Sequence, residues 1–279
     1  MVFIASISPK ATELFGCPFL TNSMLFALVV ALVIILFVQV SLRRVRLVPS
    51  GLQNFCEWLF ESLYTMLEGV VGHHMIRRTF PLLCTFFVFI ATANLSGLLP
   101  GVGTLGWGHG HGLFSVEVHD PVVRPANADL NMTLAMTAVF FFFWIYWTLR
   151  EVGPIGFLKH LFAPKGLMGF KGKPVWLKAL TLLLNIFLIL IFLLVGGIEV
   201  ISIASRAITL PLRLYGNIFA GENLLHAMGS MGGFMLNIVI SVPFYIMEIL
   251  VSVLQALVFT LLCAVYIQLS TAHEEGDSH

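Results

Sequence analysis

Four ionisable side chains stand within one long apolar stretch of the sequence, GGIEVISIASRAITLPLRLYGNIFAGENLLHAMG. They are Glu199, Arg206, Arg213 and Glu222. A charge in the hydrocarbon region of a bilayer is energetically costly, and such residues normally face protein or water and mark ion pathways. This stretch therefore predicts a path for ions or protons through a membrane.

The spacing of these residues is ordered. Glu199, Arg206 and Arg213 are seven residues apart, so they share one face of a helix over about 21 Å, at about 1.5 Å per residue. Asn217 continues that face one turn later. Glu222 follows nine residues after Arg213, which places it on the opposite side of the helix at about 100° per residue. The helix is thus expected to present a cation on one side and a carboxylate on the other.

The last apolar segment carries a complementary polar stripe. Glu248, Ser252 and Gln255 recur at i, i+4 and i+7 in SVPFYIMEILVSVLQALVF, which puts them on one helix face. Two membrane helices therefore each carry ionisable or amide groups on a defined face. We predict that protons and water pass between these helices.

A structural role is the alternative for several of these residues. Arg206 and Glu199 fit equally well as an ion pair that only holds helices together. His226 lies near the turn sequence GSMGG, where it either takes part in the relay or simply meets water at the membrane edge. For Arg213, Glu222 and Glu248 together, a functional role is favoured because intramembrane charge is costly.

The composition excludes a soluble protein. Hydrophobic residues make up 58% of the 279 residues, charged residues only 10%, and the mean hydropathy is +0.96, whereas soluble domains carry about a quarter charged residues. A net charge of +1 gives no reason to expect nucleic acid as a partner. The sequence contains no G-x-x-x-x-G-K-[ST] phosphate-binding loop, so we predict a chain that does not handle ATP itself and is not an enzyme.

We predict no metal and no cofactor. The four cysteines form no C-x-x-C pair, which indicates ordinary apolar filling and no metal site or disulfide framework. The loop sequence GWGHGHG holds His109 and His111, which could bind a metal, but a glycine- and histidine-rich loop is more often only polar and flexible.

Five apolar segments are long enough to cross a bilayer, which takes about 20 residues. They cover residues 24–41, 80–100, 130–149, 176–198 with a continuation to about 228, and about 233–271. The last two are long enough to be tilted, and Pro243 is a candidate bend. In residues 51–72, Leu52, Phe55, Leu59 and Leu63 recur at three- or four-residue steps among acidic residues, which predicts an amphipathic helix at the membrane interface or against other helices.

These segments define a single all-α polytopic membrane domain, 1–279. Its parts are an N-terminal segment with the first span (1–47), the amphipathic helix (48–75), spans two and three (80–150) with an outside loop (101–128), an inside loop (151–175), a long helical hairpin with the ion path (176–272), and a tail (273–279).

Basic residues predict the orientation. Eleven of the fifteen Lys and Arg residues lie between spans one and two or between spans three and four. Cytoplasmic loops carry such an excess. Lys10 and Arg124 fall on the other side. We therefore expect the N-terminus outside and the C-terminus inside.

The run LPLRLYGNIFAGENLL resembles the signature of subunit a of F-type ATP synthases, the static subunit beside the rotating c-ring. An intramembrane Arg-Leu-aromatic-Gly-Asn followed by Ala-Gly and an acid is a specific pattern. Other parts of the chain resemble the same family, from about residue 48 onward. They are LVPSGLQNFCEWLFESLYTMLEGVVG, FVFIATANLSGLLPG, RPANADLNMTLAM and LQALVFTLLCAVYIQLS.

The resemblance implies roles for single residues. Arg213 matches the family's essential arginine, Asn217 the asparagine after it, and Glu222 the following acid. Gln255 matches the glutamine of the last helix, and Glu248 stands where some bacterial members have histidine and others glutamate. Glu199 matches an acid near the start of the same long helix, and Arg206 stands where bacterial members often have a base. We place Glu199 and His226 in the proton path, with Arg206 and Ser252 as supporting residues.

The resemblance also implies a mechanism and partners. Two offset aqueous half-channels would meet the c-ring, a proton would be relayed by Glu222 and Glu248, and Arg213 would separate the channels. We predict in addition that the Arg213 guanidinium donates a hydrogen bond to Gln255, which holds it in place. The last two segments would lie tilted against the ring. Expected partners are the c-ring, b-type peripheral stalk subunits, the lipid bilayer and, indirectly, the catalytic head, with H⁺ or Na⁺ as the ion.

Glutamate at position 222, where mitochondrial members usually have histidine, and the third-span motif favour a bacterial or chloroplast-like origin over a mitochondrial one. The predicted location is a bacterial plasma membrane, with a thylakoid or mitochondrial inner membrane as the alternative. Two other classes compete with this interpretation. One is a secondary ion transporter, against which the sequence shows no inverted repeats. The other is a structural subunit of another membrane complex, against which the charged residues argue.

Overall fold

The structure is a computed structural model of the full chain. It describes residues 21–43, 45–49, 51–99, 102, 106–110, 116–121, 124–154, 156, 175–230 and 234–271. The predicted inside loop therefore lies mostly outside the described residues, and so does the acidic tail.

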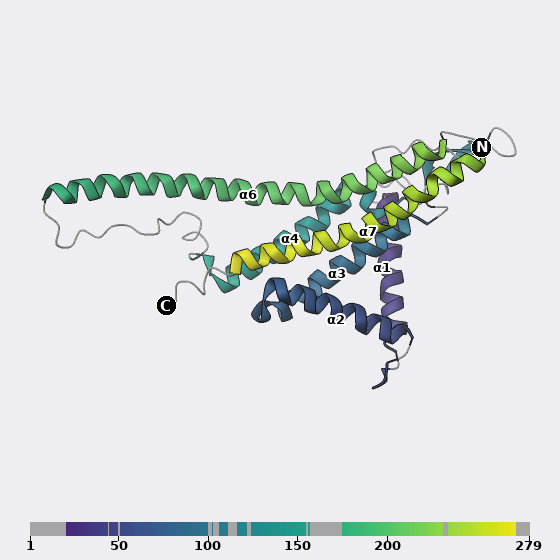
Figure 1. Ribbon diagram of the computed structural model, residues 1–279, viewed down its shortest axis with the longest axis horizontal. Coiled ribbons are helices and arrows are strands. Elements are labelled where there is room, and N and C mark those ends of the chain that lie inside the picture. Colours follow the sequence, from purple (N-terminus) through teal and green to yellow (C-terminus); the bar gives the residue numbers. More distant parts are fainter. Residues whose placement is uncertain are drawn as a thin grey trace. The chain divides into compact units, whose positions relative to one another are not determined.

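The described chain is built from long helices (Figure 1). They are α1 (Asn22–Ser41), α2 (Leu52–Val71), α3 (His73–Gly97), α4 (Leu130–Glu151), α6 (Val175–Ser230) and α7 (Phe234–Thr271). Five of the helices described are long and apolar enough to cross a membrane: α1, α3, α4, Leu184–Leu225 within α6, and Ser241–Ser270 within α7. The predicted all-α class with five membrane segments is thus confirmed.

Three short elements are described between α3 and α4. Strands β2 (Gly106–Gly110) and β3 (Val116–Pro121) pair antiparallel, and a 3-10 helix η1 (Ala126–Ala128) follows. The hairpin is a small addition to an otherwise helical fold. The side chain of His109 and all of His111 lie outside the described residues, so the structure says nothing of a metal between them.

Helices α6 and α7 are longer than a single straight span. Helix α6 has 56 residues and continues through Pro211, and α7 has 38 residues and continues through Pro243. The apolar run predicted for 176–198 and its charged continuation therefore form one uninterrupted helix. This continuity carries Arg213 and Glu222 on the same rigid element.

The described residues fall into two compact units. The first contains residues within Met1–Thr137 and Leu210–Gln268, and the second contains residues within Ala138–Thr209 and Leu269–His279. The first unit holds α1, α2, α3, the second part of α6 and nearly all of α7. It is the unit that positions the predicted ion path.

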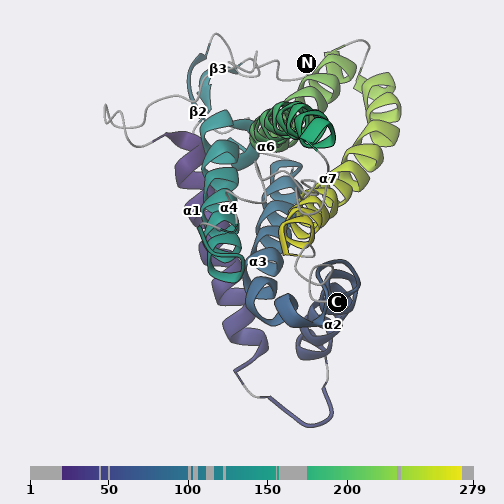
Figure 2. The same cartoon turned by 90° about the vertical axis from the view of Figure 1, so that its left-hand side faces the viewer.

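Helix α3 is central in the first unit, and α1 and α7 pack against it (Figure 2). Its buried side includes Leu83, Phe87 and Ile90, and Phe86 makes an edge-to-face contact with Phe259 of α7 at a centroid distance of 5.7 Å. Near the start of α1, Ala27 lies in a small apolar cluster with residues of α3 and η1. Small residues at this contact allow the backbones to approach closely.

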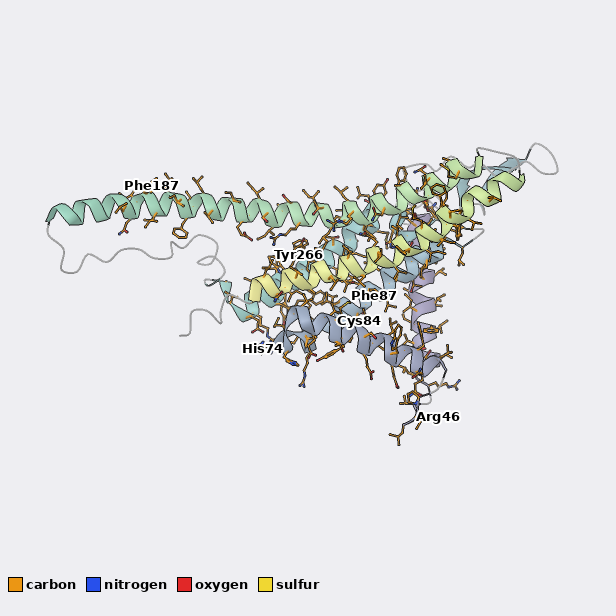
Figure 3. All side chains as sticks on the ribbon, in the orientation of Figure 1. Arg46, His74, Cys84, Phe87, Phe187 and Tyr266 are labelled. Carbon is orange, nitrogen blue, oxygen red and sulfur yellow. The ribbon has the colours of Figure 1, made fainter. Side chains whose placement is uncertain are left out.

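Helix α2 runs across the direction of α1 (Figure 1). The amide of Gln53 fixes the connection: its Oε1 accepts from the Arg46 backbone N–H at 3.1 Å, and its Nε2 donates to the Arg46 carbonyl at 3.0 Å. Figure 3 shows Arg46 at the far end of this connection, away from the helices around α3. The predicted apolar face is only partly buried, because Leu63 is buried whereas Leu52 and Phe55 are exposed.

Candidate ion path

Helices α6 and α7 meet through polar side chains as well as apolar ones. The Nδ2 of Asn217 on α6 donates to the Oε1 of Gln255 on α7 at 2.7 Å. On either side of Asn217, Leu214 and Ile218 are buried. The polar stripe of α7 faces the same interior, since Glu248, Ser252 and Gln255 are each no more than 5% exposed. The register of the two helices therefore brings Asn217 opposite Gln255.

One turn further along α6, a glycine makes room for a carboxylate. A Cβ built on Gly221 would collide with the carboxylate of Glu248, whereas at Gly216 and Gly197 it would meet nothing within 4 Å. The side chain of Glu248 thus lies directly on the backbone of α6, beside Glu222. Gly221 is the feature that lets the carboxylates of two helices approach each other.

Arg213 occupies a different environment. It is an exposed side chain on the outer surface of α6, between Leu212, which is also exposed, and the fully buried Leu214. We expected Gln255 to hydrogen-bond its guanidinium. Among the described residues that bond is absent, because the Gln255 oxygen accepts from Asn217 instead. The register of α6 and α7 puts Asn217, one turn after Arg213, in front of the glutamine.

Glu222 is half-buried, and its Oε2 atom is fully buried. Two charged groups act on its carboxylate: Arg124, which attracts it, and Glu248, which repels it. Arg124 is itself buried, at 4% exposure. The contact at Gly221 places the Glu248 carboxylate next to Glu222 on the backbone of α6.

A chain of amide hydrogen bonds lies beside this cluster. Asn127 Nδ2 donates to Asn94 Oδ1 at 2.5 Å, and Asn94 Nδ2 donates to the Ser252 carbonyl at 3.2 Å. Both asparagines are buried. The chain ties the segment before α4 and the end of α3 to α7, one turn from Glu248.

Sequence reasoning did not place Arg124, Asn94 and Asn127 in the site. Arg124 was assigned to an outside loop and used only for orientation. The usable signals were a polar residue inside the apolar span, in ATANLSG, and the dense polar run RPANADLN before the third span. Buried polar groups in membrane helices are expected to pair with one another.

Three buried oxygens of this region have no hydrogen-bond partner within the described part of the chain. They are Glu222 Oε2, Ser252 Oγ and Asn127 Oδ1. Buried polar atoms are almost always hydrogen-bonded, to protein or to ordered water. The region around Glu222 and Ser252 is therefore polar enough to accept water.

Glu199, Arg206 and His226 were also predicted to belong to the ion path. Glu199 and Arg206 are half-buried and belong to the part of α6 that falls in the second unit. The backbone of His226 is in α6, but its side chain lies outside the described residues. No group of three or more His, Cys, Asp or Glu side chains in the described chain could hold a metal.

Comparison with known proteins agrees with this arrangement. The family model of the ATP synthase A chain matches residues 24–268, which include every helix described above for most or all of its length. This chain belongs to the ATP synthase A chain family. As a member it is a subunit of the membrane sector of an ATP synthase and carries none of the ATPase chemistry.

Individual relatives support the same assignment. The ATP synthase subunit a of Protochlamydia amoebophila is 30% identical over 266 residues, which cover 92% of this chain and 83% of that protein. That of Geobacter sp. (strain M21) is 32% identical over 235 residues, with 83% and 79% covered. That of Gloeobacter violaceus is 29% identical over 258 residues, with 92% and 86% covered. Membership of the family decides against a secondary transporter or a subunit of an unrelated complex.

Proposed function

We propose that this A chain is the stator that forms two proton half-channels against a ring of c-subunits and couples proton flow to rotation and ATP synthesis. The observation that carries the proposal is the pairing of opposite environments on α6. Arg213 is exposed on its surface, while Glu222 stands near the buried Glu248 one helix away.

Arg213 suits the role of a fixed charge at a moving interface. An arginine remains protonated in proteins, so it does not relay a proton as an ordinary acid or base does. It attracts a carboxylate of a passing c-subunit and favours that group's ionised form, so the proton leaves. A positive charge between the two half-channels also opposes direct leakage of protons. Its exposure on α6 gives it access to such a partner.

Glu222 and Glu248 suit the role of the relay. In this scheme a proton enters from outside, passes along these two carboxyls with Ser252, Asn217 and Gln255 beside the path, and reaches a c-subunit. The unpartnered oxygens of Glu222 and Ser252 support a hydrated route. Glu199 and His226 are also placed in the proton path, and Arg206 is given a supporting role, all on the same long helix.

The same scheme includes the remaining partners and the membrane. The b-type stalk subunits hold this stator against the ring, and the catalytic head is reached only indirectly. The excess of basic residues in the loops after the first and third spans supports an outside N-terminus and an inside C-terminus. The proposed location is a bacterial plasma membrane, and the ion is H⁺ or Na⁺.

The test is isolation of the complex from membranes through a tag on this chain. We expect an oligomeric c-ring, stalk subunits and a soluble ATPase to purify with it. The membrane sector reconstituted in liposomes should conduct protons when a potassium diffusion potential is applied. A chain that purifies without a c-ring, or a reconstituted sector without proton conduction, would contradict the proposal.

A further inference from the structure

Large apolar side chains lie exposed at the connection between α1 and α2, beyond the end of the first membrane span. Helix α1 ends at Ser41 and α2 begins at Leu52. Among the described residues of this region, six large apolar side chains are each at least 49% exposed: Val45, Leu47, Val48, Leu52, Phe55 and Trp58. We call these six residues, together with Arg43 and Arg46, the α1–α2 corner. Exposed apolar patches mark surfaces that bind a membrane or another protein.

The opposite end of α2 is built differently. There α2 joins α3 at Gly72, and the apolar side chains of Val71, Met75 and Ile76 are each no more than 6% exposed. The chain therefore buries its apolar residues at one end of α2 and leaves them uncovered at the other. The crossing of the bilayer by α1 does not account for this exposure, because the corner follows the end of that helix.

Hydrogen bonds give the corner a defined shape. The buried amide of Gln53 makes two bonds to the backbone of Arg46, and its Nε2 also donates to the Oε1 of Glu57 at 2.8 Å. The rings of Phe55 and Trp58 lie next to each other, with their centroids 6.3 Å apart. The exposed surface is therefore held in place without a partner, which lowers the entropic cost of binding one.

Helical geometry divides α2 into an apolar side and an acidic side. Phe55 lies on the side of Leu52, about 60° from it at about 100° per residue, and Trp58 stands between the two sides. The three acids of α2 lie on the other side, about 140° to 180° from Leu52, and they are Glu57, Glu61 and Glu68. This division fits the boundary of a bilayer, where tryptophan is enriched at the level of the headgroups.

Arg43 and Arg46 add positive charge to the corner. Both side chains are exposed, and Figure 3 shows Arg46 at the far end of the connection. Within the described part of the chain, neither guanidinium has an acidic partner. Arginine binds phosphate through two parallel hydrogen bonds, and basic residues beside a membrane are attracted to anionic lipids. The charge and the apolar side chains of the corner therefore fit one partner, the surface of a phospholipid leaflet.

We propose that the α1–α2 corner inserts into the lipid leaflet at which α1 ends, and that Arg43 and Arg46 bind the phosphates of anionic phospholipids there. The six apolar side chains then lie among headgroups and acyl chains, and the acids of α2 face water. The proposal concerns the anchoring of the chain and does not depend on the ion path.

The test places a fluorescent probe on the corner and measures which lipids reach it. Leu47→Cys, at a fully exposed position, is labelled with a nitrobenzoxadiazole fluorophore in the assembled complex, which is then reconstituted in phosphatidylcholine nanodiscs. Phosphatidylglycerol or phosphatidylcholine with a spin label on the acyl chain near the headgroup is included as the quencher, in increasing fractions. The ratio of the two half-quenching fractions measures the preference for the anionic lipid. The unchanged protein, treated with the same fluorophore, gives the background from the native cysteines.

We expect both lipids to quench the probe, and the anionic lipid to do so at the smaller fraction. Combining Arg43→Gln with Arg46→Gln should reduce the preference about fivefold or more, since a single basic residue near an anionic membrane surface already contributes about that factor. Should the double variant fail to assemble, Arg46→Gln alone should reduce the preference about fivefold. The matched control is Arg77→Gln, an exposed arginine near the start of α3, which should keep the original preference.

Several results would overturn the proposal. A probe that neither lipid quenches would show that protein or water, and not the leaflet, surrounds the corner. Equal quenching by the two lipids at Leu47→Cys with both arginines present would contradict anionic selection, and so would a preference that persists after removal of the arginines. A preference that Arg77→Gln reduces equally would assign the effect to the general surface charge of the chain.

Discussion

Two arginines of this chain stand in opposite surroundings. Arg213 lies exposed on the outer surface of α6, whereas Arg124 is buried and held by the carbonyl of Ala128. An exposed cation on a membrane helix needs a partner from outside the chain, and a buried cation must be balanced within it. The same type of side chain therefore meets two different requirements within one chain.

The largest effect is expected at Arg213. Arg213→Ala should abolish ATP-driven proton pumping, since the proposed scheme gives the role of the fixed charge to the Arg213 guanidinium alone. The measurement is acidification of inverted membrane vesicles after ATP addition. Arg150→Ala, at the exposed end of α4, serves as the control and should pump normally. Coupled pumping by Arg213→Ala would remove the arginine from the mechanism.

The second largest effect, a loss of proton flow, is expected at Glu222. Glu222→Gln keeps the size of the side chain and cannot give up a proton, so proton flow should fall about 10²-fold, within the usual range for a positioned acid or base. Assembly with the c-ring should remain. Glu61→Gln, an exposed acid of α2, is the comparison. Unchanged flow in Glu222→Gln would exclude this carboxyl from the relay.

The contact between Gly221 and Glu248 gives a graded test. Gly221→Ala places a methyl group where the Glu248 carboxylate lies, and the carboxylate can rotate away without separating the helices. We expect about a tenfold slower proton flow, because small displacements of reacting groups are costly, with normal assembly. Gly197→Ala meets nothing within 4 Å and should behave as the unchanged protein. Equal flow in both variants would show that the position of Glu248 does not matter.

The smallest effect concerns stability. Asn94→Leu keeps the branched shape of the side chain but leaves Asn127 and the Ser252 carbonyl without their partner, which should lower stability by about 1–3 kcal/mol. The thermal unfolding of the detergent-solubilised complex is the readout, with the exposed Asn54→Leu as the comparison. If Asn94→Leu leaves the midpoint of thermal unfolding unchanged, the chain of amide hydrogen bonds does not hold the segment before α4 in place.

Much of this architecture was accessible from the sequence. The five spans follow from runs of apolar residues, and the facing of Glu248, Ser252 and Gln255 toward one side of α7 follows from helical periodicity alone. The relative directions of side chains on one helix follow from the helix geometry and do not depend on the neighbouring helices. For the same reason, Arg213 and Glu222 could be assigned to opposite sides of one helix.

Relations between segments could not be obtained in this way. The pairing of Asn217 with Gln255, where Arg213 was expected, depends on how far α6 slides along α7. Arg124 was missed because a residue before a span carries no periodic signal of burial, and its position depends on contacts with α1, α3 and α7. The partly exposed start of α2 likewise depends on which side of that helix meets its neighbours.

The bare backbone at Gly221 has a consequence for motion. The Glu248 carboxylate lies directly on the main chain of α6, so the main chain sets how closely the two helices approach. Displacements of whole helices take microseconds or longer, whereas side chains change rotamer in picoseconds to nanoseconds. In the proposed scheme, the short-range steps of a proton between Glu222 and Glu248 would then depend on the fast side-chain motions. Rotation of the ring, and not passage along the stator, would set the pace of the motor.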